Sequence, residues 1–170
     1  GMMDDTDRIA FTVGESKKSG LIVDTPNICQ SEYEFSITDN KTIIYGLGAI
    51  KGVGESLVRA IVLERENNGS YDDIFDFCLR IEKKYLNRRA VEALIYSGAF
   101  DVFGVNRATL IATYPRAIKQ AEQRQNDFSK GQVSLFSGVE SHIEYEKKYI
   151  KGEYFSFKKM LMFEKSVMGY

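Results

Sequence analysis

The sequence predicts a mainly α-helical fold with a small N-terminal β-hairpin, and three observations carry that prediction. Apolar residues recur at helical spacing in several separate segments. Capping residues and glycines stand at the ends of those segments. Two short β-rich runs, YEFSI and TIIY, flank Asp39 and Asn40, which are residue types that favour a tight turn. With 44% hydrophobic and 28% charged residues in 170, the chain can bury a core.

The N-terminal segment, residues 1–32, is expected to hold a helix and a connector. Residues 4–19 suit a helix, and Gly20 is its expected stop. Gly1 precedes two methionines, which is typical of an expression scar. The run FEKSVMGY at the other end has no closing signal, so the chain is expected to be a piece of a longer protein.

Residues 33–125 are predicted to form the hairpin and the main helical domain. A helix over 55–66 is followed by one that Ser70 is expected to cap. Asn87 caps the next helix, which Gly98 ends, and Asn106 caps the one after it. The apolar stripes of the first three helices are Leu57, Val58, Ile61 and Val62, then Ile74, Phe75, Cys78 and Ile81, then Ala90, Val91, Leu94 and Ile95.

Pro115 is expected to begin a further helix, because proline is not tolerated in a helix interior. Thr113 would cap this helix, which runs to about residue 127. Over 126–153 the periodicity fades while Gly, Ser and charge rise, which indicates a surface linker. The last segment, 154–170, predicts a helix from Ser156 to Gly169 whose apolar side comprises Phe157, Met160, Leu161 and Val167.

Composition excludes several classes of function. Cys29 and Cys78 lie far apart and His142 is the single histidine, so neither a zinc site nor a cysteine–histidine nucleophile pair is expected. No secretory signal or apolar run long enough to cross a membrane occurs, and a cytoplasmic protein is expected. The net charge of −1 restricts any nucleic-acid contact to a local surface.

The glycine cluster YGLGAIKGVGES is the first candidate binding site. It fails the dinucleotide pattern G-x-G-x-x-G at Lys51, and it fails the P-loop pattern because Gly52 follows that lysine. The spacing fits a helix-hairpin-helix instead. Ala49 and Ile50 end a short helix, Lys51 to Gly54 form the hairpin, and Glu55 opens the second helix.

Such a hairpin suits a phosphate group. Gly52 and Gly54 lack a Cβ, so a phosphate oxygen can approach amides at the positive end of the second helix. Val53 would turn inward, and Lys51 adds a charge. This contact reads the nucleic-acid backbone and not the base sequence. A glycine turn without a ligand explains the pattern equally well, and a monovalent cation bridging hairpin and phosphate stays open.

A second, looser copy follows in EALIYSGAFDVFGVNRATL, where Gly104, Asn106 and Arg107 stand between hairpin and helix. Paired hairpins can hold both strands of a duplex. A subordinate basic rim comprises Lys83, Lys84, Arg88 and Arg89. Base-excision glycosylases also use such modules, but Ser56 stands where they carry the catalytic lysine, so that function is not expected.

The linker contains QVSLF, residues Gln132, Val133, Ser134, Leu135 and Phe136. An apolar pair in a segment without periodicity predicts a docking peptide, with Leu135 and Phe136 filling a pocket and Gln132 at its rim. Folding back of the pair onto its own domain is the alternative.

Five motifs together resemble the α-subunit family of bacterial DNA polymerase III, the replicative polymerase. They are IIYGLGAIKGVGES, IFDFC, LNRRAVEALIYSGAFD, GVNRATL and GQVSLF, in this order from Ile43 to Phe136. The resemblance implies a tandem helix-hairpin-helix region that binds the duplex leaving the active site, and a QVSLF motif that docks on the β sliding clamp.

The resemblance also implies what this chain lacks. The family's catalytic aspartates and Mg²⁺ belong to an upstream palm, and an oligonucleotide-binding domain follows after Tyr170. We therefore expect a non-catalytic fragment whose partners are double-stranded DNA, the β clamp and other domains and subunits of the polymerase III holoenzyme. The rival hypothesis is a helical protein–protein scaffold with structural hairpins, which the near-neutral charge favours.

Overall fold

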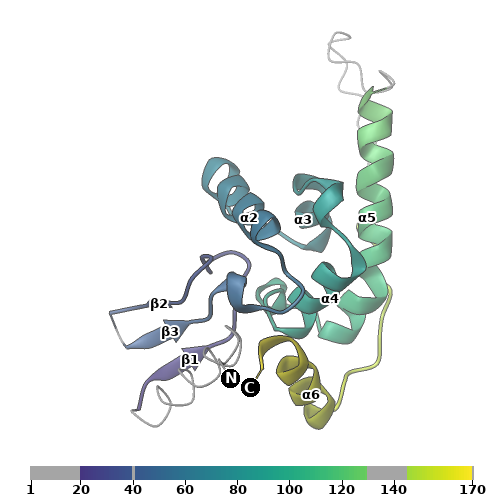
Figure 1. Cartoon of the computed structure of the whole chain (residues 1–170). Helices are drawn as coiled ribbons and strands as arrows, with labels where there is room; N and C mark the ends of the chain where they lie inside the picture. The colour runs from purple at the N-terminus through teal and green to yellow at the C-terminus, as the bar shows by residue number, and fades with distance from the viewer. Residues whose placement is uncertain (1–19, 40, 130–144, 170) are drawn as a thin grey trace, which may run out of the picture.

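The computed structural model describes residues 20–39, 41–129 and 145–169, and within them the predicted mainly helical fold is confirmed (Figure 1). The predicted helix over 4–19, Asn40 and the peptide 132–136 lie outside the described residues. The strands are β1 (Ile22–Asp24), β2 (Ser36–Ile37) and β3 (Thr42–Ile44). The α-helices are α2 (Glu55–Asn68), α3 (Ile74–Arg80), α4 (Arg88–Tyr96), α5 (Arg107–Ser129) and α6 (Phe157–Met168). Short 3-10 turns are η1 (Leu47–Ala49), η2 (Lys83–Tyr85) and η3 (Asp101–Phe103).

The sheet contains the predicted hairpin and one strand that the sequence did not indicate. β2 and β3 pair antiparallel, with Ser36 opposite Ile44, which confirms the hairpin. β1 pairs in parallel with the other edge of β3, giving the order β1-β3-β2. A three-residue strand is too short to show an alternating pattern, and its partner lies far along the chain.

Four helices, α2 to α5, enclose the core above this sheet (Figure 1). The predicted stripes of the first three are buried, except that Val62 is only partly buried. Phe77 of α3 is fully buried, and its ring meets that of Phe100 edge to face at 5.0 Å. α3 packs on α5 on the side of the domain away from the sheet (Figure 1).

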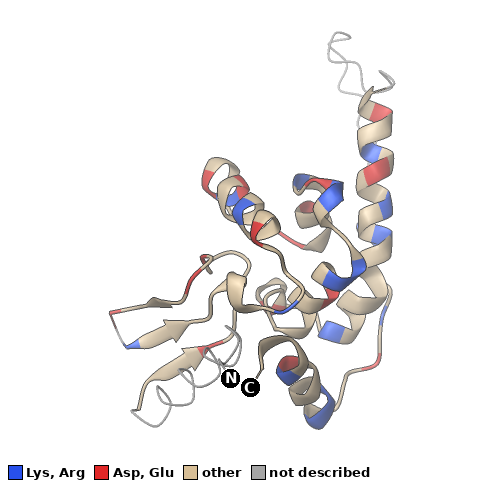
Figure 2. Ribbon diagram, in the orientation of Figure 1, with Lys and Arg blue, Asp and Glu red and all other residues tan. Residues whose placement is uncertain are grey.

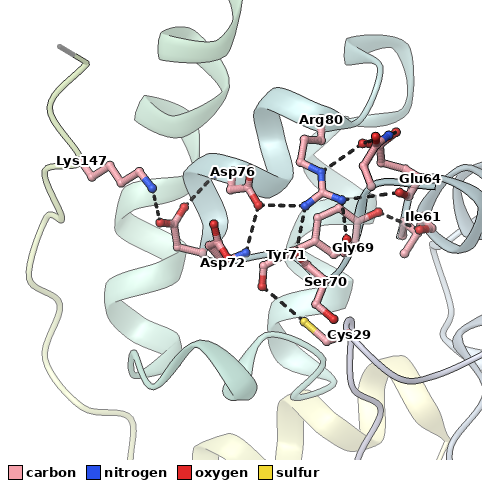
Figure 3. Close-up of polar contacts among 12 residues, drawn as sticks. Cys29, Ile61, Glu64, Gly69, Ser70, Tyr71, Asp72, Asp76, Arg80 and Lys147 are labelled. Atoms are coloured by element: carbon pink, nitrogen blue, oxygen red, sulfur yellow. Dashed lines mark hydrogen bonds and ion pairs between the residues drawn. The ribbon is translucent and has the colours of Figure 1, made fainter. Parts of the chain in front are cut away.

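The start of α3 corrects the prediction that Ser70 is its cap. Asp73 is the N-cap, and its Oδ1 accepts a hydrogen bond from the Asp76 amide at 2.7 Å. The preceding residues are held by Arg80 instead, which donates to the carbonyl of Ser70 and lies 4.4 Å from the centre of the Tyr71 ring (Figure 3). Because the Tyr71 hydroxyl donates to the Ile61 carbonyl at 2.7 Å, the loop is packed down and the helix begins three residues later.

Pro115 lies inside α5, so the prediction that it opens a new helix is wrong. The ring removes one helical hydrogen bond, at a cost of about 3 kcal/mol. Tyr114 and Ala117 on either side are buried, and the Tyr114 hydroxyl donates to Glu92 of α4 at 2.6 Å, so packing of this part of α5 offsets that cost. Thr113 is buried, and its hydroxyl accepts a bond from the Ile150 amide at 2.9 Å instead of capping a helix.

Residues 145–156, which we call the strap, have no regular secondary structure but run back along α5. The Tyr145 hydroxyl donates to Asp127 at 2.6 Å, and the Gly152 amide donates to the Thr109 hydroxyl at 3.0 Å. Lys147 reaches across to Asp73 at 2.6 Å (Figure 3). The part of the predicted linker that the structure describes is therefore attached to the domain.

The C-terminal helix is confirmed as α6, with the Ser156 hydroxyl capping its start and Gly169 at its end. Its apolar side differs from the prediction. Phe157 is 76% exposed and Leu161 is 46% exposed, whereas Met168 is buried and Phe163 stacks on Tyr96 at 4.1 Å. Among the described residues, no helix has the length and hydropathy needed to cross a membrane.

Candidate nucleic-acid interface

The first hairpin joins η1 to α2 through residues 50–54 and has one buried and one open side. Val53 is 6% exposed and packs into the core, as its predicted inward orientation requires. Gly52 has a φ of +94°, a conformation that side-chain-bearing residues rarely adopt. Gly54 is the N-cap of α2, and nothing lies within 4 Å of the place where its Cβ would be. The chain therefore presents bare backbone at the start of α2.

The amides of this hairpin divide into committed and available groups. The Lys51 amide donates to the Val167 carbonyl at 2.7 Å, and the Val53 amide donates to the Ile50 carbonyl at 3.2 Å. Among the described residues, the amides of Gly52 and Gly54 have no acceptor. The amides of the first turn of α2 have no partner within the helix, and the helix dipole adds partial positive charge there. An anion is the ligand that this end of α2 favours.

The side chains around the hairpin set its local charge. Lys51 is exposed beside the available amides. Glu55 opens α2 with a carboxylate, which alone would repel an anion, but Arg59 pairs with it at 2.5 Å on the next turn. Lys51 and the helix dipole therefore both contribute positive charge at the mouth of the hairpin.

The C-terminal end of α6 supports the first hairpin, a contact that sequence reasoning missed. Besides the Val167 carbonyl, the Met168 carbonyl accepts a hydrogen bond from the Tyr45 hydroxyl at 3.1 Å. These carbonyls carry the partial negative charge of a helix end. No local pattern could have found the contact, because the partners are more than a hundred residues apart in sequence.

The second hairpin, residues 97–106, is longer and includes η3 between α4 and α5. Gly104 adopts the left-handed conformation with a φ of +71° and faces open space. Asn106 caps α5 as predicted, because its Oδ1 accepts from the Thr109 amide at 2.9 Å. Its Nδ2 donates to the Thr109 hydroxyl, so both ends of the amide face α5.

Arg107 is buried, with 5% of its side chain exposed. Its guanidinium donates to Asp101 at 2.9 and 3.1 Å, to Glu164 of α6 at 2.8 Å and to the Tyr96 carbonyl at 3.3 Å. Burial disfavours the charged form, but the two carboxylates outweigh it and the pKa of Arg107 is raised. The side chain joins the second hairpin to α6 and does not face the solvent.

Three of the four cations in the predicted basic rim pair with carboxylates of their own domain. Lys83 binds Glu122 at 2.7 Å, Lys84 binds Glu82 at 3.4 Å, and Arg88 binds Glu92 at 2.9 Å. Figure 2 shows these basic segments where the chain enters α4, with acidic segments interleaved. The fourth, Arg89, lies against Gly52.

Groups able to hold a metal or act as a nucleophile are scarce in the part of the chain that the structure describes. It contains no cluster of three or more histidine, cysteine or acidic side chains with metal-binding geometry. Cys78 is buried, and burial raises the pKa of its thiol to about 12. Burial, aided by a hydrogen bond to Glu92, likewise raises the pKa of Tyr114 to about 12.

A comparison with known protein families agrees with this arrangement of two hairpins. A family described as the helix-hairpin-helix motif matches residues 20–110, which is more than half of the chain and includes both hairpins. The chain belongs to the helix-hairpin-helix family. Within this helix-hairpin-helix region, the first hairpin combines an open glycine, Gly54, with available amides.

The relatives of this chain are several times longer than the chain itself. The DNA polymerase III subunit alpha of Pasteurella multocida is 40% identical over 168 residues, which is 98% of this chain and 14% of the relative. The same subunit of Xylella fastidiosa strain Temecula1 is 46% identical over 138 residues, and that of Haemophilus influenzae is 38% identical over 168. They cover 81% and 98% of this chain, and 12% and 14% of the respective relatives. The helix-hairpin-helix chain is thus homologous to about one seventh of these subunits.

Proposed function

We propose that this helix-hairpin-helix region is a non-catalytic part of a replicative DNA polymerase that binds duplex DNA through backbone phosphates. The observation that carries the proposal is the open start of α2, where Gly54 leaves the amides accessible beside the exposed Lys51. The homology to DNA polymerase III subunit alpha supplies the setting, because a polymerase must hold its product without reading its sequence.

The first hairpin, Lys51 to Glu55, makes the principal contact in this proposal. Gly52 and Gly54 offer their amides and Val53 anchors the turn in the core. Gly104 of the second hairpin is open to a backbone approach, so a weaker contact there accompanies the first. We leave Arg107 out of the interface, because its guanidinium is occupied by carboxylates of the same domain.

Binding by this chain alone should be weak and sensitive to salt. The net charge of −1 provides no general attraction, and each phosphate neutralised contributes a slope of about −0.9 in a plot of log K against log salt. Attachment to a polymerase raises the effective concentration, which strengthens weak contacts roughly a hundredfold or more. A weak contact also lets the duplex move on as synthesis proceeds.

We propose further that Gln132, Val133, Ser134, Leu135 and Phe136 dock on the β sliding clamp. The described residues on either side support this arrangement. α5 ends at Ser129, and Tyr145 returns beside Asp127, so both ends of the intervening segment lie at the tip of α5 (Figure 1). That tip is the end of the helix remote from both hairpins.

The DNA contact is tested by the charge reversal Lys51→Glu, with duplex affinity measured by fluorescence anisotropy at low salt. Lys119→Glu is the matched control, because Lys119 is an exposed lysine on α5 away from both hairpins. We expect Lys51→Glu to abolish salt-dependent binding and the control to retain it. Equal affinities for the two variants would refute the role of the first hairpin.

The clamp contact is tested by replacing Leu135 and Phe136 together with alanine and measuring binding to the purified β clamp. We expect the affinity to fall to background, because the two side chains supply the apolar contact. Replacement of Val133 alone should change the affinity much less, since the docking hypothesis places it outside the pocket. Unchanged clamp binding by the double variant would refute the docking role.

A scaffold that binds protein and not DNA is the second candidate, and the exposed apolar side chains of α6 and of the strap before it favour it. Tyr154 is 79% exposed, Phe157 is 76% exposed and Met162 is 62% exposed, and such a group of apolar side chains is typical of a protein contact. Clamp binding without any salt-dependent DNA binding would support the scaffold. Salt-dependent DNA binding that Lys51→Glu removes would exclude it as the sole function.

A further inference from the structure

Arg89 differs from the other three cations of the basic rim because it pairs with no carboxylate among the described residues. Lys83, Lys84 and Arg88 are each within 3.4 Å of a carboxylate oxygen of their own domain. Arg89 is exposed and follows Arg88 directly in the first turn of α4. Two adjacent arginines of the same helix therefore have different electrostatic surroundings.

Arg89 also lies where the proposed phosphate contact needs a cation. The position that a Cβ of Gly52 would occupy is 3.1 Å from Arg89 Cγ and 3.2 Å from its Nε. The aliphatic part of the side chain thus covers one side of Gly52, while the side at Gly54 stays open. The packed stem holds the guanidinium at the hairpin, and less conformational entropy is lost when it binds.

The placement is unfavourable for the helix itself. The first turn of α4 contains Arg88 and Arg89 and no acidic residue. The positive end of the helix dipole disfavours a cation there. Glu92 relieves Arg88 by an ion pair, whereas Arg89 has no such relief in the described part of the chain. A bound anion would offset the repulsion between Arg89 and the helix dipole. A side chain that is locally unfavourable in this way is typical of a ligand-binding site.

We propose that Arg89 completes the phosphate site of the first hairpin and, with Lys51, binds the DNA backbone from the two sides of Gly52. The inference rests on the proposed function and deepens it. Lys51 acts as a mobile point charge, and the guanidinium of Arg89 supplies two parallel donors that match the geometry of a phosphate group. α4 thereby contributes to a contact that the hairpin sequence alone would assign to η1 and α2.

The experiment compares Arg89→Gln with Arg88→Gln, which removes the same charge from the adjacent residue. Duplex affinity is measured by fluorescence anisotropy over a series of KCl concentrations, and thermal unfolding confirms that both variants fold. We expect Arg89→Gln to weaken binding about tenfold at low salt and to lower the salt slope by about 0.9. Arg88→Gln should leave the slope unchanged, and Arg89→Lys should restore the slope but only part of the affinity.

The outcomes separate the inference from the proposal beneath it. If Lys51→Gln loses affinity while Arg89→Gln behaves like Arg88→Gln, the role of Arg89 is refuted and the hairpin contact survives. If neither Lys51→Gln nor Arg89→Gln loses affinity, or if the unmodified chain shows no salt-dependent binding, both are refuted. Equal losses for Arg88→Gln and Arg89→Gln indicate a general charge effect and also refute the inference.

Discussion

Replacing Arg107 with methionine should destabilise the fold while leaving any DNA contact at the first hairpin intact. The substitution keeps the length of the side chain and removes every hydrogen bond of the guanidinium. It leaves the Glu164 carboxylate, whose side chain is 20% exposed, and the Tyr96 carbonyl without that donor. Asp101 is 43% exposed, so water can replace its lost partner.

The loss of stability can be worked out from these lost contacts. Removing one partner of a buried ion pair costs roughly 3–5 kcal/mol. Because Asp101 regains water, the cost should lie near the lower limit, at about 3 kcal/mol. A chain of this size loses roughly 2–4 °C of melting temperature for each kcal/mol, so the melting temperature should fall by roughly 6–12 °C.

Far-UV circular dichroism during heating measures the effect, and Arg116→Met is the control. Arg116 is an exposed arginine of the same helix, and its replacement should change stability by no more than about 0.5 kcal/mol. Combining Arg107→Met with Glu164→Gln should be less destabilising than the sum of the two, since both remove the same contact. Unchanged melting by Arg107→Met, or weaker DNA binding without a change in melting, would refute the structural role assigned to this residue.

Four further changes test other parts of the structure. Gly54→Ser should raise stability by a few tenths of a kcal/mol, because the serine hydroxyl can cap α2. It should also weaken duplex binding, because the hydroxyl would then accept from the amides that we propose bind phosphate. A gain in both stability and binding would contradict the open-amide site. Asp73→Ala should cost about 1–2 kcal/mol in urea unfolding, because it removes both the α3 cap and the partner of Lys147, and Lys147→Ala should cost clearly less. The free energy of unfolding should fall between about pH 9 and 12, because the thiol of Cys78 ionises near pH 9 in the unfolded chain and its pKa is about 12 in the folded one. Cys78→Ala should make this fall less steep. An equal fall in both proteins would exclude the thiol as its cause. Exchange of KCl for tetramethylammonium chloride at equal ionic strength should leave duplex affinity unchanged if N–H donors make the contact, whereas a loss would indicate a bridging monovalent cation at the hairpin.

Local periodicity was sufficient to predict most of the helices, because a buried stripe such as that of α4 repeats within a few residues. The register of the first hairpin was predictable for the same reason: Gly52, Val53 and Gly54 are adjacent, and their conformations depend on the turn itself. β1 could not be predicted, since three residues carry no pattern and its stability comes from pairing with β3.

The missed features all depend on partners distant in sequence. Pro115 is exposed and is tolerated inside α5 because α3 and the strap hold that helix in place, and neither contact can be inferred from its neighbours in sequence. The burial of Arg107 requires Glu164 of α6. Arg88 and Arg89 are indistinguishable in sequence, and only the proximity of Gly52 separates them.

The direction of the strap determines how the chain would respond to mechanical force at the tip of α5. A pull applied there loads the Tyr145–Asp127 hydrogen bond first, and the later contacts bear load only after it opens. Opening would proceed one contact at a time as far as Gly152, which is confined against the backbone of Ala108. At about 3.3 Å for each residue released, the attachment could lengthen by up to about 26 Å while α6 and the first hairpin keep their positions. The strap would thus act as an extensible tether, lengthening contact by contact so that movement at one end of the molecule does not strain the other.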